Sequence, residues 1–463
     1  GGIPMAFKTV GKRKPKYEGM AHVTGESQFV DDIFVPRTLT VKAFRSPVHK
    51  GRILKLDTSK AEQMDGVAGV ITYKDVPANA YGFGADQPVL VETDVRYKGE
   101  PIAAVAAEDA KTAYKALDAI IIDIEEQEPV FDPIKAMEPD APKVVPDGNI
   151  MMFEDLPYNL ATTGDIETGF KEADHVLEET YFFPEQEHTA METQVSLAVP
   201  EAAGRITVYS VCQDRNMLLG MLAGILQLGS KDALKCECAS EWAGRTRSAW
   251  RQHAGLNRLK MQSGPVGGGF GGKNEFHADP ITAILALKTG RPCKWRWTRK
   301  EEIFYSTHRS AMHITCKDGV KNDGRIVARY IKTIRDSGAY VGFNGYATGK
   351  TNSFANGPYY VPNIRIESAA VFTNKPVSST MRGFALAPVT FAVEAQMDRD
   401  AKTIGMDPLE FRFKNAMRRG DKLVNEQVMN DTSIIEVMQT LAKKAGIQLP
   451  DHLSQMTSND RRE

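Results

Sequence analysis

The strongest local constraint in this sequence is a glycine-rich stretch, PVGGGFGGKNEF, which runs from Pro265 to Phe276. Five of its twelve residues are Gly. Glycine reaches backbone conformations that are closed to other residues, and it lets a ligand touch main-chain N–H groups. Successive N–H groups can form a concavity that binds anions. The stretch therefore predicts either a loop pressed against a large polar ligand or a tightly packed glycine turn.

Two well-known phosphate-binding motifs do not match this stretch. A P-loop requires Gly-Lys followed by Ser or Thr at a fixed spacing, and Lys273 is followed by Asn274. The dinucleotide fingerprint needs a preceding strand, a βαβ unit and an acidic residue about twenty positions later. Only a loose glycine spacing is similar here, so a nucleotide-binding function is disfavoured.

Length and composition are typical of a soluble globular chain. The 463 residues predict two or three domains, because a single hydrophobic core rarely grows that large. Hydrophobic residues make up 42%, charged residues 25%, and the net charge is −1 at pH 7. This balance argues against nucleic acid as a partner. No apolar run is long enough to span a bilayer, so we expect no membrane partner.

The cysteines show no metal-binding pattern. They are odd in number and irregularly spaced, and the close pair Cys236 and Cys238 forms a CxC rather than a CxxC. A zinc or iron–sulfur site in this chain is therefore disfavoured. Free, buried thiols in a reducing, cytoplasmic setting are the favoured interpretation. It applies to Cys212, Cys236, Cys238, Cys293 and Cys316.

Hydrophobic periodicity predicts an α+β fold with two main regions. Residues 17–128 interleave strands with helices as one α/β domain. A proline- and acid-rich connector follows over 129–157. Residues 158–447 begin as half-buried strands and end in helices. Residues 448–463 form a polar tail that we expect to be frayed.

Local signals mark several elements within these regions. A helix is expected over 107–119, with Asp109 near its start, and a strand over 293–302. Pro408 suits the first turn of a later helix. Ser433 and Glu436 have the spacing of a capping box, in which each side chain accepts from the other residue's backbone N–H.

The segment 230–256 fits neither region. It holds two of the four Trp residues and several Arg residues. It is either a surface insertion that packs on a partner or a peculiarity without function, and both interpretations stay open.

Other motifs accompany the glycine stretch in a fixed order. Upstream lie RSPVHKGRILKLDTSKA, VRYKGEPIAAVAAED and PEQEHTAMET, and downstream lie TGRPCKWRWTRKEE, STHRSAM, GPYYVPNIR and TNKPVSSTMRGFALAPVTF. Together they resemble the molybdenum-cofactor subunit of the xanthine dehydrogenase and aldehyde oxidase family, especially split-chain members such as nicotinate dehydrogenase. The resemblance covers nearly the whole chain except 230–256 and the two ends. It implies an N-terminal α/β hammerhead domain over 17–128 and the first half of a molybdopterin-binding α+β region over 158–447.

The resemblance also implies a chemistry. In this family, molybdenum is held by a pterin dithiolene, so no side chain is expected to bind the metal directly. A hydroxo ligand attacks an electron-poor carbon of an N-heterocycle or aldehyde, and hydride passes to a sulfido or selenido ligand. Electrons then leave through iron–sulfur clusters to FAD, which are expected on partner subunits. The expected cofactor is molybdopterin with molybdenum, and a cytosine dinucleotide form is one candidate. The protein's share is positioning and electrostatics.

The resemblance assigns cofactor-binding roles position by position. Gln186 matches the glutamine that hydrogen-bonds the apical oxo ligand, although a polar residue at a strand end is the alternative. Arg382 in MRGF matches the arginine near the cofactor. The loop backbone that approaches metal and pterin matches Gly268, Gly269, Phe270, Gly271 and Gly272, with Phe270 as a wall of the site.

Three further positions concern the substrate. Phe384 matches an aromatic residue that sandwiches a flat substrate, with core packing as the alternative. Purine-hydroxylating members carry Glu where this chain has Asn274, so an acidic partner for a purine is missing there, although Glu275 is adjacent. A substrate-contacting arginine falls on Lys350, which keeps the charge but loses the planar fork. A purine or a nicotinate-like, anionic N-heterocycle is the expected substrate.

A short acidic and histidine-containing cluster, Glu187, His188 and Glu192, invites a metal-site interpretation. The surrounding alternation is strand-like, and the sequence lacks an HExxH motif. A structural histidine is therefore favoured.

The family's general base is a glutamate in a GxGE motif, which does not occur in this sequence. We therefore expect a second molybdopterin-binding subunit to supply this glutamate, beside an iron–sulfur subunit and an FAD subunit. Gln186 and the intact glycine loop favour an active subunit. An aldehyde-oxidising member of the family and a non-catalytic assembly or cofactor-carrier protein remain the alternatives.

Overall fold

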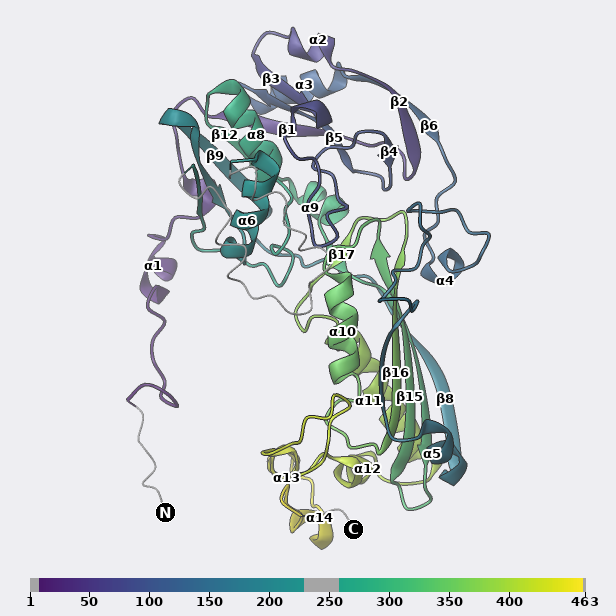
Figure 1. Cartoon of the computed structure of the whole chain (residues 1–463). Helices are drawn as coiled ribbons and strands as arrows, with labels where there is room; N and C mark the ends of the chain where they lie inside the picture. Colours follow the sequence, from purple (N-terminus) through teal and green to yellow (C-terminus); the bar gives the residue numbers. More distant parts are fainter. Residues whose placement is uncertain (1–7, 229–257, 461–463) are drawn as a thin grey trace.

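The computed structural model describes residues 8–228 and 258–460, and it confirms an α+β architecture (Figure 1). The segment 230–256, with Cys236 and Cys238, lies outside the described residues. Two bodies are seen in Figure 1, one around β1, β5, β9 and β12 and the other around β8, β15 and β16. Strand β17 lies where the two bodies meet.

The first body is built on a seven-stranded sheet with the order β11-β10-β9-β12-β1-β5-β3. Its strands are β1 (Leu39–Arg45), β3 (Val67–Thr72), β5 (Pro101–Ala107), β9 (Val195–Glu201), β10 (Arg205–Ser210), β11 (Leu259–Gln262) and β12 (Cys293–Arg296). Strand β1 runs parallel to β12 through Leu39↔Cys293 and Thr40↔Lys294 and antiparallel to β5. One sheet therefore combines strands of the region 17–128 with strands from beyond residue 158.

The core of this sheet joins the same distant parts of the chain. Helices α6 (Arg215–Leu226) and α8 (Asp279–Thr289) pack on it. Leu39 and Val41 of β1 lie in one buried cluster with Trp295 of β12 and Ile284 of α8. All four residues are at most 5% exposed, so the burial of apolar surface holds the sheet together across the chain.

Smaller elements complete the amino-terminal part. A three-stranded sheet has the order β4 (Asp94–Val95), β2 (Gly51–Asp57) and β6 (Ile121–Glu126). The short helices are α1 (Gly19–Thr24), α2 (Ser59–Glu62) and α4 (Pro133–Ala136). The helix expected over 107–119 is observed as α3 (Ala110–Asp118), because β5 continues through Ala107. Asp109 caps it by accepting the Thr112 N–H at 2.8 Å.

The second body is a five-stranded sheet backed by helices. Its order is β7 (Asn159–Thr163), β16 (Asn363–Phe372), β15 (Ile326–Gly338), β14 (Met312–Val320) and β8 (His175–Phe183). Helices α10 (Asn344–Phe354), α11 (Leu386–Thr403), α12 (Pro408–Asn415) and α5 (Ile166–Glu172) accompany it. Pro408 occupies the first turn of α12, as predicted.

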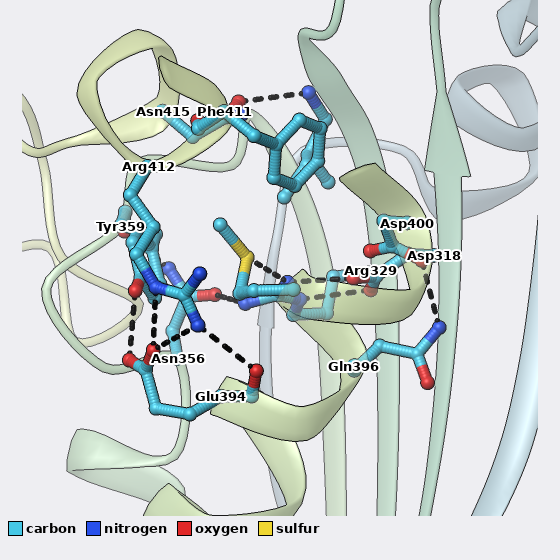
Figure 2. A network of polar contacts seen from close by, with 12 residues as sticks. Asp318, Arg329, Asn356, Tyr359, Glu394, Gln396, Asp400, Phe411, Arg412 and Asn415 are labelled. Atoms are coloured by element: carbon cyan, nitrogen blue, oxygen red, sulfur yellow. Dashed lines mark hydrogen bonds and ion pairs between the residues drawn. The ribbon is translucent and has the colours of Figure 1, made fainter. Parts of the chain in front are cut away.

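A buried polar network fixes α11 to this sheet (Figure 2). Arg329 of β15 donates through Nε and Nη2 to the two carboxylate oxygens of Asp318 on β14, at 2.8 and 2.6 Å. Asp400 of α11 lies beside this pair in Figure 2 and accepts from the Gln396 amide at 2.9 Å. Tyr181 of β8 donates to Gln396 at 2.9 Å, so the network crosses from the sheet to the helix.

The carboxyl-terminal part differs from two predictions. Ser433 precedes α13 (Ile434–Lys444), but its side chain makes no capping hydrogen bond. The predicted capping box is wrong because Glu436 instead accepts the Ser458 N–H and O–H at 2.9 and 2.6 Å. The tail is also not frayed up to residue 460, since it forms α14 (Asp451–Ser454) and buries Leu453 to 3% exposure.

Two general predictions can be compared with the described residues. Cys212, Cys293 and Cys316 are free, buried thiols, as expected, and burial raises their pKa values. Within residues 8–228 and 258–460, no helix is both long and apolar enough to cross a membrane.

Candidate functional site

The glycine loop, residues 265–276, connects β11 to α8 and contacts the segment that follows β17 (Ser378–Ser379). Thr380 donates its hydroxyl to the Gly271 carbonyl at 3.0 Å. Arg382 donates its backbone N–H to the Phe270 carbonyl at 2.8 Å. The two motifs that the resemblance brought together, the glycine stretch and MRGF, are thus hydrogen-bonded neighbours.

Neighbouring atoms of the protein leave no room for a side chain at three of these glycines. Gly271 has a φ of +109°, and a Cβ there would collide with the Thr380 backbone. A Cβ on Gly272 would lie 2.7 Å from Nδ1 of His188, and one on Gly269 would collide with the Gln213 amide. The prediction offered a ligand contact or a tight glycine turn, and tight packing is what the buried side of the loop shows.

The other side of the loop is open. Phe270 has a φ of +51° and is 48% exposed, so it does not pack in a core. Among the described residues, the N–H groups of Gly269 and Phe270 donate to no protein acceptor. An exposed aromatic ring beside two unpaired N–H groups suits a ligand that carries oxygen or negative charge.

A layer of polar side chains supports the loop, with Gln194 and His188 buried and Gln213 exposed. Gln213 accepts from the N–H groups of Gly271 at 2.8 Å and Lys273 at 3.3 Å. Gln194 donates to the Gly272 carbonyl at 3.0 Å. Nε2 of His188 lies 2.7 Å from the Thr380 carbonyl, and burial lowers the pKa of this imidazole. His188 is a buried, hydrogen-bonded structural residue, as the sequence favoured.

Lys273 and Glu192 form a buried ion pair that sequence reasoning missed. Lys273 is 2% exposed, and its Nζ lies 2.8 Å from Oε2 of Glu192. The same carboxylate oxygen accepts the Gly267 N–H at 2.8 Å. The only sequence signal was a Lys directly after a glycine run, and local pattern could not say which acid would reach it. Within the described residues, no group of three or more His, Cys, Asp or Glu side chains could hold a metal ion.

Gln186 lies at the edge of this region, next to a buried arginine. It forms an isolated β-bridge with Arg309 of β13 (His308–Arg309), whose N–H donates to the Gln186 carbonyl at 2.8 Å. The Gln186 side chain is exposed. Arg309 is buried and donates through Nη2 to the Arg382 carbonyl at 2.8 Å. Arg309 therefore connects Gln186 to the MRGF segment.

Arg309 has unused donors. Its Nε and Nη1 are buried and have no hydrogen-bond partner among the described residues. Burial lowers the pKa of Arg309, and its guanidinium forms no ion pair with an acid among the described residues. The motif STHRSAM contains this arginine, but sequence reasoning did not single it out. Its free N–H groups, together with exposed Arg382, fit an anionic group.

The substrate candidates divide into two places. Phe384 has a φ of +43°, and its partly exposed ring lies 5.2 Å from Tyr346 and 6.1 Å from Phe343. Lys350, one turn further along α10, lies 5.5 Å from the Tyr346 ring. Asn274 instead donates to the Thr380 hydroxyl at 3.2 Å, within the layer beneath the loop.

Glu275 is also withdrawn from the open side. It accepts from the Ser379 hydroxyl, and burial raises its pKa to about 7. An acidic group adjacent to Asn274 is therefore held by β17.

Models of known protein families match both main regions of the chain. A family model described as the molybdopterin cofactor-binding domain matches residues 152–238 and 229–416. A second, described as the aldehyde oxidase and xanthine dehydrogenase a/b hammerhead domain, matches residues 24–128. The solved aldehyde oxidoreductase from Desulfovibrio gigas superposes with a TM-score of 0.82 at 27% identity. That likeness covers 93% of this chain and 46% of the other.

Two curated relatives are more similar in sequence. A probable xanthine dehydrogenase subunit of Bacillus subtilis is 39% identical over 87% of this chain and 50% of its own length. The nicotinate dehydrogenase large molybdopterin subunit of Eubacterium barkeri is 33% identical over 95% of this chain and 97% of its own length. The chain thus spans about half of the first relative and nearly all of the second.

These matches define a molybdopterin-binding fold. The chain belongs to the xanthine dehydrogenase and aldehyde oxidase family of molybdenum-dependent oxidoreductases, and it carries both the hammerhead and the molybdopterin-binding domain of that family.

Proposed function

We propose that this chain is the molybdopterin-binding subunit of a cytoplasmic, multi-subunit hydroxylase that acts on an electron-poor carbon of an N-heterocycle. The nearly end-to-end match with a nicotinate dehydrogenase large molybdopterin subunit supports this choice of reaction. When bound, molybdopterin with its molybdenum, in a cytosine dinucleotide or simpler form, supplies the oxidising chemistry that places an oxygen from water on the substrate.

The chain's own contribution to cofactor binding is electrostatic. The N–H groups of Gly269 and Phe270 have no acceptor among the described residues, and Gly268, Gly271 and Gly272 flank them in the same loop. Arg309 and Arg382 supply positive charge, and the exposed Gln186 amide supplies an uncharged donor. Donors fixed before the ligand arrives lose little free energy to reorganisation, so they suit an anionic cofactor.

The proposed substrate class rests on one observation. Three aromatic residues lie together with Lys350 beside them, namely Phe343, Tyr346 and Phe384. Flat rings pack well against a heteroaromatic substrate. Lys350 Nζ lies 5.5 Å from the rings of both Tyr346 and Phe354, which leaves a compact cation at the margin of the group. A ring that bears a carboxylate matches this combination of a flat surface and one positive charge.

We further propose that the remaining functions lie on partner chains. A second molybdopterin-binding subunit would supply the general-base glutamate, and separate subunits would carry the iron–sulfur clusters and FAD. The support is that relatives of this chain are called subunits, in one case at nearly the same length.

The test is to purify the chain with its natural partners, measure molybdenum, iron and flavin, and assay nicotinate, xanthine and aldehydes. We expect all three components and highest kcat/KM for a carboxylated N-heterocycle. Lys350→Met should lower kcat/KM for the carboxylated substrate about tenfold or more, because a hydrogen-bonded charge contributes about 1.5–3 kcal/mol. Lys350→Arg is the matched control and should retain most activity.

Three results would contradict these proposals. Absence of molybdenum from the intact complex would favour the assembly or carrier alternative. Highest activity with aldehydes, unaffected by Lys350→Met, would favour the aldehyde-oxidising alternative, which the likeness to aldehyde oxidoreductase supports. Hydroxylation by this chain alone would refute the proposed partner base.

A further inference from the structure

A cavity of about 40 Å³ lies between the two regions that the sequence predicts, and Phe276 at the end of the glycine loop is among the residues that line it. Arg45, Tyr97 and Glu100 line it from the region 17–128. His277, Trp297 and Thr307 line it from the region 158–447. The cavity is large enough for a few waters or one small ion, since one water needs only about 10–15 Å³.

Arg45 enters the cavity inside a box of aromatic rings. Its Cζ lies 4.5 Å from the ring centre of Tyr305, 4.8 Å from Trp297 and 5.4 Å from Trp295. The ring faces attract the cation, but they do not accept hydrogen bonds in the guanidinium plane. Within the described residues, only Nη1 has an in-plane partner, the Gly99 carbonyl at 2.9 Å. Nε and Nη2 are buried without a partner in the same part of the chain.

In two other arginines of this chain, the edge of the guanidinium formed by Nε and Nη2 contacts a carboxylate. Arg329 uses Nε and Nη2 to bind Asp318 at 2.8 and 2.6 Å. Nε and Nη2 of Arg412 both lie 2.9 Å from a single oxygen, Oε2, of the Glu394 carboxylate. This edge presents two parallel N–H groups that match the two oxygens of a carboxylate. In Arg45 the matching edge has no partner among the described residues, and Arg45 is one of the residues that line the cavity.

Other donors line the same cavity. Nε1 of Trp297 and Oγ1 of Thr307 have no partner among the described residues, and these two residues are 3% and 6% exposed. Both oxygens of Glu100 are already engaged, one by the Arg96 N–H at 2.8 Å and the other by the Tyr340 hydroxyl. The cavity is therefore lined by residues with unpartnered donors, and among them is a cation whose Nε–Nη2 fork is free.

We propose that this cavity binds a small planar oxyanion, of the formate, nitrate or bicarbonate class, on the Nε–Nη2 edge of Arg45. Trp297 Nε1 and Thr307 Oγ1 donate to its remaining lone pairs. Since the lining residues come from both regions of the chain, the bound anion stabilises their contact. The site is independent of the proposed catalytic function.

The test is thermal unfolding of the full chain, with any subunits that co-purify, after exchange into chloride buffer. Sodium formate, nitrate and bicarbonate are titrated separately against sodium chloride at equal ionic strength, and the best of the three identifies the ligand. We expect a saturable rise in Tm of several degrees with at least one oxyanion and none with chloride. Arg45→Lys should abolish this rise, because lysine keeps the charge but lacks the fork.

Controls separate binding from general salt effects. Arg52→Lys, at an exposed arginine on β2, should respond as the wild type does. If Arg45→Lys does not fold, Thr307→Val should still weaken the best oxyanion about tenfold or more, since it loses a bond to a charged group. Equal Tm shifts with all anions, or unchanged binding in the Thr307 variant, would overturn the proposal. So would a crystal structure grown in formate that shows only water beside Arg45.

Discussion

At the scale of single residues, the carboxyl group of Asp400 has an unusual setting. Asp318 and Arg329 are fully buried and paired, and Asp400 lies against them (Figure 2). Burial, and then the charge of Asp318, raise the pKa of Asp400 far above its usual range. Its Oδ2 has no donor among the described residues. We therefore expect Asp400 to be protonated at neutral pH and to donate a hydrogen bond to Asp318.

If Asp400 is protonated, two isosteric substitutions should change the free energy of unfolding by very different amounts. Asp400→Asn keeps a donor in place and should change the free energy of unfolding by less than about 1 kcal/mol. Asp318→Asn leaves Arg329 buried without a counter-charge and should cost about 3–5 kcal/mol. Urea unfolding at pH 7 measures both. Equal losses in the two variants would show that Asp400 is ionised.

The sequence correctly predicted which residues lie together where those residues belong to a short local motif. The glycine stretch and MRGF were expected in one site, and Arg382 and Phe270 are indeed hydrogen-bonded through their backbones. The sequence did not reveal Arg309, the Lys273–Glu192 pair or Gln213. Each of these depends on a contact between distant segments, and no local pattern encodes which donor reaches which acceptor. The roles in cofactor and substrate binding stay predictions.

At the scale of elements, two residue pairs with the same capping-box spacing behave differently in the structure. Thr298 and Glu301 have the same spacing as Ser433 and Glu436, and only the first pair forms a capping box, at the start of α9 (Arg299–Tyr305). Helix α9 also ends the strand expected over 293–302 at Arg296. Most strands and long helices were predictable from periodicity. Helix α10 was not, since its small polar residues have no clear apolar face.

The pairing of β1 with β12 leads to a prediction about the isolated hammerhead region. A fragment of residues 17–128 lacks β12, so the edge of β1 and the cluster residues Leu39 and Val41 lose their cover. We expect this fragment to aggregate or to unfold without a cooperative transition. Circular dichroism on heating, with the full chain as the control, measures this. A soluble monomer that melts cooperatively would show that the region folds without the shared sheet.

At the scale of the whole molecule, buried acids make stability depend on pH. Burial raises the pKa values of Glu100, Glu275 and Glu302 to about 7, against an unfolded value of about 4.3. Each folded carboxyl group holds its proton more tightly than the unfolded one. The stability that each contributes is therefore complete below pH 4.3 and is lost as pH rises through 7. His277 has the opposite effect, because burial lowers its pKa to about 3.

Glu275→Gln isolates one of these groups. Between pH 5 and 7, the stability of the wild type relative to this variant should fall by at most about 1.4 kcal/mol per pH unit. Urea unfolding of both proteins at pH 5, 6, 7 and 8 tests it. Glu92→Gln, at an exposed position, is the control and should leave the pH profile unchanged. A pH-independent difference for Glu275→Gln would mean that this group is ionised throughout.

The shared seven-stranded sheet also has a consequence for folding during synthesis on the ribosome. Leu39 is made about 250 residues before its partner Cys293. At bacterial or eukaryotic elongation rates of about 5–20 residues per second, β1 waits roughly 10–50 s for β12. During that interval its apolar edge is open to neighbouring nascent chains. Production of this protein should therefore be sensitive to translation speed and to chaperones that shield an unfinished strand.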